Sequence, residues 1–270
     1  MELRNNTQLA SAARQLNFAA LVWKAIQTQS LRVPSMIRNF AMFSVSSVLV
    51  RYSPLHKKNV ALGNNVRIQR LRSLIALGPF ARISIADDTI VYENARLEAL
   101  GEGVIRVGHS CVLGDIRINC RDSVVLGNRV LTSWNVFIQD NDPHPLEPEL
   151  RAEQVLNICR NFYPKFRQLK TLKTSLSNEG EQTLNRSEMK RVAIQLRDWK
   201  PPTASVSIGD DVWLGAGSII LKGAHLGDGC VVASGSVVTA GMYPPRSVLA
   251  GQPARVVKSI PGLASIGLES

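Results

Sequence analysis

An aliphatic residue recurs every six positions through residues 205–241. A helix repeats every 3.6 residues and a strand every two, so neither element explains this period. A chain that makes one short strand and one turn every six residues buries one aliphatic side chain each time. Three such strands close a triangular coil, and stacked coils share an aliphatic column. The aliphatic positions, and the smaller residues two places before them, are Ile208, Leu214, Ile220, Leu226, Val232 and Val238, preceded by Val206, Val212, Ser218, Ala224, Cys230 and Ser236.

The same period appears more loosely upstream, where each break in register predicts an inserted residue or a bulge. Cys111 and Cys230 occupy the small inward position of their repeats, and Cys120 and Cys159 show no CxxC spacing. We therefore expect all four cysteines to be reduced and structural. The upstream positions are Leu62, Ile68, Leu74, Ile85, Val91, Leu97, Val107, Leu113, Leu126, Thr132 and Ile138.

These repeats resemble the hexapeptide-repeat family. The resemblance implies a mainly β fold, a left-handed parallel β-helix, with N-terminal coils over 60–144 and C-terminal coils over 204–258. It leaves a basic N-terminal segment at 1–59, an insert at 145–203 and a C-terminal tail at 259–270.

A polar, proline-stiffened segment follows Ile138 and contains His144. Residues 140–145 are similar to the D-x-D-x-H-P segment of hexapeptide O-acetyltransferases that act on sugars and polysaccharides, which implies that His144 is the catalytic base. An imidazole suits this role, because acyl transfer from a thioester to a hydroxyl needs a base that titrates near neutral pH. Asp142 or Asp140 would fix the tautomer of the imidazole, and the sequence leaves open which of them, if either, does so. A solvent-exposed loop histidine is the alternative interpretation.

Residues 208–217 resemble the I-G-D-N-V-W-I-G-A-G segment of the same family. The resemblance implies that Trp213 lines the acceptor and acyl pocket, although packing at a subunit interface would also explain an outward tryptophan. Asn141 is expected to contact the acceptor. The pantetheine of coenzyme A is expected at the backbone of Ala216 and Ser234.

Residues 249–258 resemble the closing A-G-x-P-A-[KR]-V segment of the family. Arg255 and Lys258 are then candidates for the phosphates of coenzyme A. A solvated surface is the alternative interpretation for these two cations.

The insert at 145–203 replaces the short loop that the family resemblance implies. It begins with apolar residues at helical spacing over 152–162, continues with a Ser/Thr/Lys-rich stretch over 171–186, and has a second helical pattern over 187–199. We expect two short helices, which form either a lid over the site or an ordinary surface excursion.

The chain carries a net charge of +11, and between Leu3 and Arg82 it has twelve Lys and Arg residues but no Asp or Glu. Residues 8–28 have the spacing of an amphipathic helix. This helix would pack on the coils or a partner subunit, or lie on an anionic membrane; a transit peptide is a weaker alternative. The segment has none of the motifs of nucleic-acid binding, and the chain has no apolar run long enough to span a bilayer and no signal peptide. We therefore expect a cytoplasmic protein that is either free or peripheral on the membrane.

Together these patterns favour an acetyl-CoA-dependent O-acyltransferase that modifies a sugar or polysaccharide hydroxyl. The resemblance implies a homotrimer, because the family's coenzyme A slot forms between neighbouring coils, and it implies no metal. N-acylation and a different acyl group stay open. A non-catalytic trimeric scaffold is one alternative. A carbonic-anhydrase-like metalloprotein is another, for which His109 and His144 would need a third ligand that the sequence does not supply.

Overall fold

The computed structural model describes residues 59–161 and 199–262, and its strands form three sheets. Sheet A contains β1 (Val60–Leu62), β4 (Arg82–Ile85), β7 (Val104–Val107), β10 (Ser123–Leu126), β13 (Val206–Ile208), β16 (Ala224–Leu226) and β19 (Gly241–Tyr243). Sheet B contains β2 (Arg67–Ile68), β5 (Ile90–Val91), β8 (Val112–Leu113), β11 (Leu131–Thr132), β14 (Trp213–Leu214), β17 (Val231–Val232), β20 (Ser247–Gly251) and β21 (Ala254–Ser259). Sheet C contains β3 (Leu74–Leu77), β6 (Arg96–Leu100), β9 (Ile116–Cys120), β12 (Val136–Gln139), β15 (Ile219–Leu221) and β18 (Val237–Val238).

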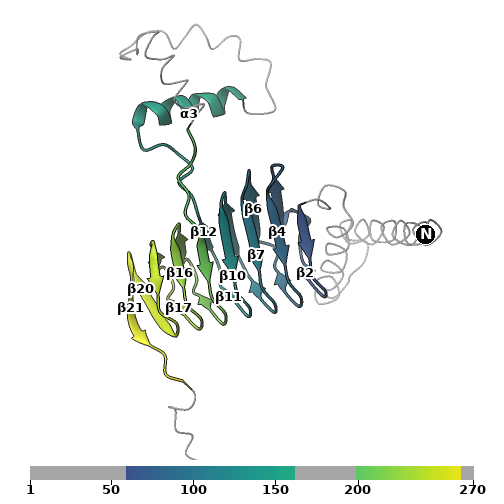
Figure 1. Ribbon diagram of the computed structural model, residues 1–270, viewed down its shortest axis with the longest axis vertical. Coiled ribbons are helices and arrows are strands. Elements are labelled where there is room, and N and C mark those ends of the chain that lie inside the picture. Colours follow the sequence, from purple (N-terminus) through teal and green to yellow (C-terminus); the bar gives the residue numbers. More distant parts are fainter. Residues whose placement is uncertain (1–58, 162–198, 263–270) are drawn as a thin grey trace, which may run out of the picture. The chain divides into compact units, whose positions relative to one another are not determined.

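The chain visits sheets A, B and C in turn, and each strand pairs in parallel with the strand one coil further on (Figure 1). This architecture is a parallel β-helix, and it is consistent with the left-handed β-helix of hexapeptide repeats that we expected. The last strand departs from the rule, because β21 turns back and pairs antiparallel with β20.

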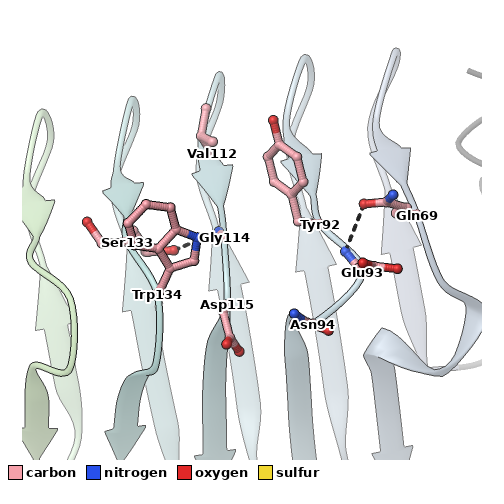
Figure 2. Close-up of a pocket in the computed structure, with 10 residues that line it drawn as sticks. Gln69, Tyr92, Glu93, Asn94, Val112, Gly114, Asp115, Ser133 and Trp134 are labelled. Atoms are coloured by element: carbon pink, nitrogen blue, oxygen red, sulfur yellow. Dashed lines mark hydrogen bonds between the residues drawn. The ribbon is translucent and has the colours of Figure 1, made fainter. Parts of the chain in front are cut away.

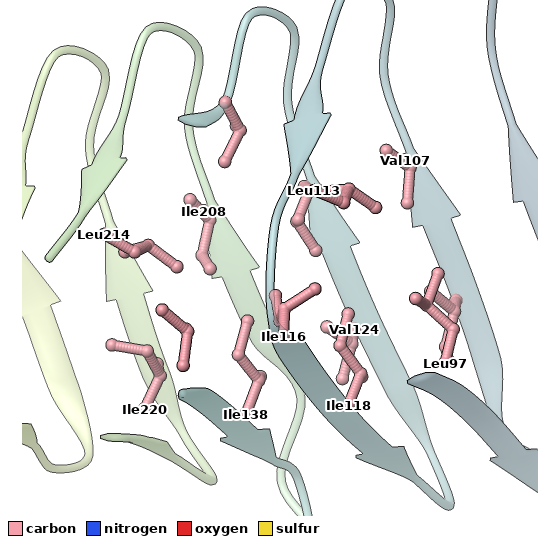
Figure 3. Packing of buried hydrophobic residues seen from close by; sticks show 14 of the residues in the cluster. Leu97, Val107, Leu113, Ile116, Ile118, Val124, Ile138, Ile208, Leu214 and Ile220 are labelled. Carbon is pink, nitrogen blue, oxygen red and sulfur yellow. The ribbon is translucent and has the colours of Figure 1, made fainter. Parts of the chain in front are cut away.

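The core is the aliphatic column that the six-residue period predicts. Ile208, Leu214 and Ile220 lie on sheets A, B and C and are buried, as are the equivalent residues of the neighbouring coils (Figure 3). Burying one such side chain contributes about 1.5–3 kcal/mol to the free energy of unfolding. Because the side chain is buried only between stacked coils, each coil adds stability only when it stacks on another.

Three of the four cysteines belong to this core. Cys111, Cys120 and Cys230 are buried thiols without a disulfide, as expected for packed core residues. Cys159 is also a free thiol, but it is exposed. The expectation that all four are structural is therefore wrong for Cys159, which lies on a helix outside the coils.

The turns between sheets A and B carry a ladder of Asp and Asn side chains. Asp210 Oδ1 accepts the backbone N–H of Asn128 at 2.8 Å, and Asp228 Oδ1 accepts that of Asp210 at 2.8 Å. A Cβ on Gly127 would overlap Asp210 Oδ1, and a Cβ on Gly209 would overlap Asp228 Oδ1. The glycine that follows the aliphatic residue therefore makes room for the Asp of the next coil.

The large excursion leaves the coils at the turn between sheets C and A. Other coils cross there in the short segments 121–122, 222–223 and 239–240, whereas residues 140–205 separate β12 from β13. The two ends of the excursion meet at its base, because Ala204 N donates to Asp140 O at 2.9 Å and Asn141 bridges to Thr203. The stack then continues as if uninterrupted, with β10 pairing with β13.

The chain divides into two compact units, the coils and residues 142–202. Within the second unit, α3 (Pro148–Asn161) corresponds to the first helix expected in the insert, and Pro148 stands at its first turn. The stretch over 171–186, the second helical pattern up to residue 198, the helix expected over 8–28 and residues 263–270 of the tail lie outside the described residues. Among the described helices, none is both long and apolar enough to cross a membrane.

Candidate functional site

His144 is exposed, and its segment is fastened to α3. The imidazole Nδ1 lies 2.8 Å from Gln154 Oε1, and Gln154 Nε2 donates to Pro143 O at 3.3 Å. Arg151 donates to the carbonyl oxygens of Pro145 and Leu146, each at 2.8 Å. The other ring nitrogen of His144, Nε2, has no hydrogen bond to any residue that the structure describes. The imidazole therefore has one anchored nitrogen and one open nitrogen.

Asp140 belongs to the coils. Its carboxylate is buried and accepts the backbone N–H groups of Arg121 at 2.9 Å and Asp122 at 2.8 Å. The Cys120 thiol donates to the same carboxylate at 3.2 Å, and burial together with the Asp140 charge raises the pKa of Cys120. Both carboxylate oxygens are thus used within the coils.

Asn141 and Asp142 follow at the base of the excursion. Asn141 is only 1% exposed, and its Nδ2 donates to Asn119 Oδ1 at 3.0 Å and Asp140 Oδ1 at 2.9 Å. Asp142 is half-buried, and its backbone N–H donates to Pro202 O at 2.9 Å. The partner of His144 Nδ1 is thus the amide oxygen of Gln154, at the place where the sequence suggested a carboxylate of Asp142 or Asp140.

Trp213 points outward from sheet B, as its position before the inward Leu214 predicts. Its side chain is 48% exposed, and its indole N–H donates to Ser133 Oγ at 3.1 Å across the neighbouring coil. Leu131 and Val231 flank it on the adjacent strands β11 and β17.

The turns between sheets B and C stack into a column, which we call the corner column. Gly217 N donates to Trp134 O and Gly235 N donates to Ala216 O, each at 2.8 Å, and Gln252 Nε2 donates to Gly235 O at 2.6 Å. The expected pantetheine positions, Ala216 and Ser234, therefore lie on successive coils of this one column.

The two candidate phosphate ligands lie on β21. Arg255 pairs with Ala250 next to the C-terminal end of the corner column, and Lys258 pairs with Val248, two residues earlier on β20. Both residues are exposed. Arg255 also donates to its neighbour's carbonyl, Ala254 O, at 2.9 Å.

A pocket of about 430 Å³ lies on the corner column, N-terminal to Ala216, and the sequence analysis missed it. Figure 2 shows that its residues come from four successive coils, with Trp134 and Tyr92 on different coils of the same corner. Trp134 is 72% exposed and Tyr92 is 44% exposed. The lining residues are Gln69, Tyr92, Glu93, Asn94, Val112, Gly114, Asp115, Thr132, Ser133 and Trp134.

The polar wall of this pocket is ordered by two contacts. Glu93 N donates to Gln69 Oε1 at 3.0 Å, and the Glu93 carboxylate lies 3.4 Å from the Arg70 guanidinium.

The pocket could not be predicted from the sequence because its residues share no short motif. They are neighbours only because turns about twenty residues apart stack on each other. Two exposed aromatic residues at one corner were the available signal.

Within residues 59–161 and 199–262, no group of three His, Cys, Asp or Glu side chains lies close enough to hold a metal ion. In particular, the described residues supply no third ligand to His109 and His144.

Comparison with protein families gives one match. Residues 205–240, the segment with the strictest six-residue period, match the hexapeptide repeat of succinyl-transferase. The hexapeptide repeat inferred from the spacing is thereby confirmed for this segment.

Among curated proteins, the chain is similar to a 2,3,4,5-tetrahydropyridine-2,6-dicarboxylate N-acetyltransferase of Staphylococcus aureus, with 48% identity over 60 residues. The match covers 22% of this chain, and the chain spans about a quarter (25%) of the length of this relative.

Several solved structures also resemble the chain. A hexapeptide-repeat-containing acetyltransferase from Vibrio cholerae is 18% identical, covers 83% of this chain and 94% of its own, and has a TM-score of 0.40. A maltose O-acetyltransferase from Clostridium difficile is 19% identical, with coverages of 83% and 88% and a TM-score of 0.31. An N-acyltransferase from Bacillus cereus in complex with dTDP and coenzyme A is 15% identical, with coverages of 78% and 90% and a TM-score of 0.43.

Proposed function

We propose that this hexapeptide-repeat protein is an acyl-CoA-dependent acyltransferase in which His144 is the general base. The observation that carries the proposal is the hydrogen bonding of the two ring nitrogens of His144. One ring nitrogen is held at 2.8 Å by Gln154, and the other is open on an exposed segment that leaves a stack of hexapeptide coils. A general base needs this combination of fixed orientation and accessible lone pair.

The reaction transfers an acyl group directly. The acceptor oxygen attacks the thioester carbonyl carbon while His144 Nε2 takes the proton of the acceptor hydroxyl. The new C–O bond forms, the C–S bond breaks, and the leaving coenzyme A thiolate receives the proton held by His144, which restores the neutral imidazole. Because the acceptor itself is the nucleophile, one histidine is sufficient.

The acyl donor is proposed to lie along the corner column. Arg255 and Lys258, beside its C-terminal end, suit the phosphates of coenzyme A. The pantetheine then follows the backbone of Ala216 and Ser234 toward Trp134. Three coil steps separate Gln252 from Trp134, which is about 14 Å at roughly 4.8 Å a step. The acyl end of the donor would thus reach the pocket.

The pocket is proposed to hold the acceptor. Because the excursion leaves its own coils at the turn between sheets C and A and the pocket lies at the turn between sheets B and C, a neighbouring subunit of the proposed trimer would supply the His144 that acts there. Exposed faces of Trp134 and Tyr92 can pack against the apolar side of a sugar ring, and the carboxylate and amide groups of Asp115 and Asn94 can bind its hydroxyls. Trp213, whose indole N–H is already bound to Ser133, contributes its ring surface beside this pocket. We assign Asp140 and Asn141 to holding the base of the excursion, since their polar groups are buried in the coils.

An amine acceptor is the second candidate. The pocket brings two carboxylates, Glu93 and Asp115, next to two aromatic rings, and this combination also attracts an ammonium group. The Staphylococcus relative is named as an N-acetyltransferase. Amino sugars therefore belong in the acceptor screen beside neutral sugars and glycans.

Our proposals for the quaternary structure and the cellular location are based on the family resemblance. We propose a homotrimer with the donor slot between neighbouring coils, in the cytoplasm, with residues 1–59 packed on the protein or lying on an anionic membrane. A fully active monomer in analytical ultracentrifugation would contradict the shared slot.

Calorimetric titration with coenzyme A tests the donor site first. Wild type should bind, and the double variant Arg255→Ala, Lys258→Ala should bind more weakly. Thiol release from acetyl-CoA, measured with neutral and amino sugars, then identifies the acceptor class. His144→Ala should lower kcat by roughly 10²–10⁴-fold while coenzyme A binding is unchanged. A wild-type protein that does not bind coenzyme A would overturn the proposal and favour the scaffold.

A further inference from the structure

We propose that Gln154, on the helix of the excursion, is a positioning residue that selects the tautomer of His144 with the proton on Nδ1. The inference rests on the proposed function for its catalytic meaning, but the tautomer itself is a property of the protein alone. The inference gives α3 the role of orienting His144. The six-residue repeat and its motifs do not explain why this helix is present.

The orientation of the Gln154 amide is the first step. A glutamine amide has an acceptor oxygen and a donor nitrogen, so either end could in principle face an imidazole. Here the nitrogen end donates to Pro143 O at 3.3 Å, and a carbonyl oxygen can only accept. The oxygen end must therefore face His144, where it lies 2.8 Å from Nδ1.

The proton position follows from this orientation. Two acceptors at 2.8 Å would repel, so Nδ1 must carry the proton and donate it to Gln154 Oε1. In a neutral imidazole the other nitrogen, Nε2, then holds the lone pair. Nε2 is the nitrogen without a hydrogen bond to any described residue, so the lone pair is available to a substrate proton.

Hydrogen bonds of α3 support this contact. Gln154 lies in the middle of α3, whose backbone hydrogen bonds fix its position. Arg151, three residues earlier, binds the carbonyl oxygens of Pro145 and Leu146, so α3 holds the chain on both sides of the imidazole. A histidine without such a contact would exchange between tautomers, whereas the contact with Gln154 favours one of them.

The choice of an amide has a chemical consequence. A carboxylate at this place would fix the same tautomer and also stabilise the imidazolium, as in a catalytic triad. The neutral amide fixes the tautomer without adding a negative charge. The excursion thus supplies the partner that the sequence suggested for Asp142 or Asp140, and supplies it in neutral form.

Nitrogen NMR of the imidazole tests the inference directly. The chain has four histidines, so ¹⁵N-labelled histidine gives a small set of ring signals, and His144→Ala identifies the His144 pair. At a pH where the imidazole is neutral, long-range ¹H–¹⁵N spectra distinguish a protonated Nδ1 from a protonated Nε2. We expect wild type to show the Nδ1–H form.

Three variants of α3 complete the experiment. Gln154→Leu removes the acceptor and should shift His144 to the Nε2–H form or to a mixture of both. Gln154→Glu keeps an acceptor oxygen and should keep the Nδ1–H form. Asn157→Leu removes an amide one turn further along α3, which makes no hydrogen bond to His144, and should change nothing. Circular dichroism checks that each variant retains its fold.

The kinetic readout is a split between kcat and KM. Gln154→Leu should lower kcat by about 10-fold to 100-fold, which is less than the full loss of roughly 10²–10⁴-fold expected when the general base itself is removed, and leave the donor KM unchanged. Gln154→Glu should retain activity. A loss in Gln154→Leu that Gln154→Glu does not rescue would overturn the positioning role.

The two proposals fail separately. If wild type shows the Nε2–H form, or if Gln154→Leu keeps the Nδ1–H form, the inference about Gln154 is wrong even in an active enzyme. If the tautomer shifts as expected but wild type transfers no acyl group from any acyl-CoA, the positioning of His144 stands and the proposed function falls.

Discussion

Asp210 Oδ1 accepts the backbone N–H of Asn128 at 2.8 Å, although 82 residues separate the two in the chain. The Asn128 side-chain amide binds the same carboxylate at 3.0 Å. These contacts lie at the turn between sheets A and B, and they join the coil before the excursion to the coil after it. The hydrogen bonds of the Asp and Asn ladder therefore continue from one coil to the next although residues 140–205 are inserted between them.

Replacing Asp210 should weaken this join. Asp210→Ala leaves the Asn128 N–H without its acceptor, so we expect Tm to fall by several degrees. Asp211→Asn is the control, because the Asp211 side chain binds only the exposed guanidinium of Arg129 among the described residues and such surface pairs contribute little. Asparagine also tolerates the positive φ of this position, so the variant adds no backbone strain. Differential scanning calorimetry measures both. Equal Tm values for the two variants would contradict a structural role of the ladder.

The same carboxylate makes stability depend on pH. The Asn128 side-chain amide, and then its backbone N–H, hold the pKa of Asp210 below the usual range. A group with a lowered folded-state pKa stabilises the fold above its unfolded-state pKa, about 3.9, and loses that contribution as the pH falls through the folded-state value. The Tm advantage of wild type over Asp210→Asn should be full at neutral pH and shrink below about pH 4. An advantage that does not change with pH would contradict the assignment.

Gly127→Ala tests whether the glycine of one coil must make room for the Asp210 carboxylate of the next coil. A Cβ at this position would overlap Asp210 Oδ1 and crowd the backbone of Gly209 and Asp210, which cannot move without breaking the stack. We expect a loss of about 1–3 kcal/mol in the free energy of unfolding, measured by urea denaturation. Gly262→Ala is the control, because a Cβ there meets no atom within 4 Å. A tolerated Gly127→Ala would show that the turn can open.

The contrast between repeat and excursion explains what the sequence could predict. Ile208, Leu214 and Ile220 were placed correctly because each coil imposes the same constraint on its inward residue, so the pattern is repeated many times. The outward direction of Trp213 followed from the same register. The partner of His144 did not, because Gln154 meets it through a single, non-repeating turn of chain onto α3.

The cysteines illustrate the same limit. The repeat register correctly buried Cys111 and Cys230, whereas the helical spacing around Cys159 suggested packing that the described residues do not provide. Register predicts burial only where the partner surface is part of the repeat. The pocket at Trp134 was missed for the related reason that its residues are brought together by stacking and not by any local motif.

Thiol reactivity tests the distribution of the cysteines. Burial raises the pKa values of Cys111, Cys120 and Cys230, which lowers their thiolate fraction and adds to their steric protection. The native protein should release about one equivalent of thionitrobenzoate per chain quickly, since only the thiolate attacks the disulfide reagent. Cys159→Ser should abolish this fast phase. Fast labelling that persists in Cys159→Ser would show that a core thiol is accessible.

Trp134 gives the sharpest test of the acceptor pocket. Because its side chain is 72% exposed, Trp134→Ala should leave Tm nearly unchanged. Its ring faces the pocket, and an aromatic contact contributes about 0.5–1.5 kcal/mol, so the acceptor KM should rise by about twofold to tenfold. Coenzyme A affinity should change less, because Arg255 and Lys258 lie at the other end of the corner column. Phe80→Ala removes another exposed ring, 64% accessible, which lies outside the pocket, and should leave the acceptor KM as it is. If Trp134→Ala and Phe80→Ala behave alike in the thiol-release assay, the acceptor does not bind between Trp134 and Tyr92.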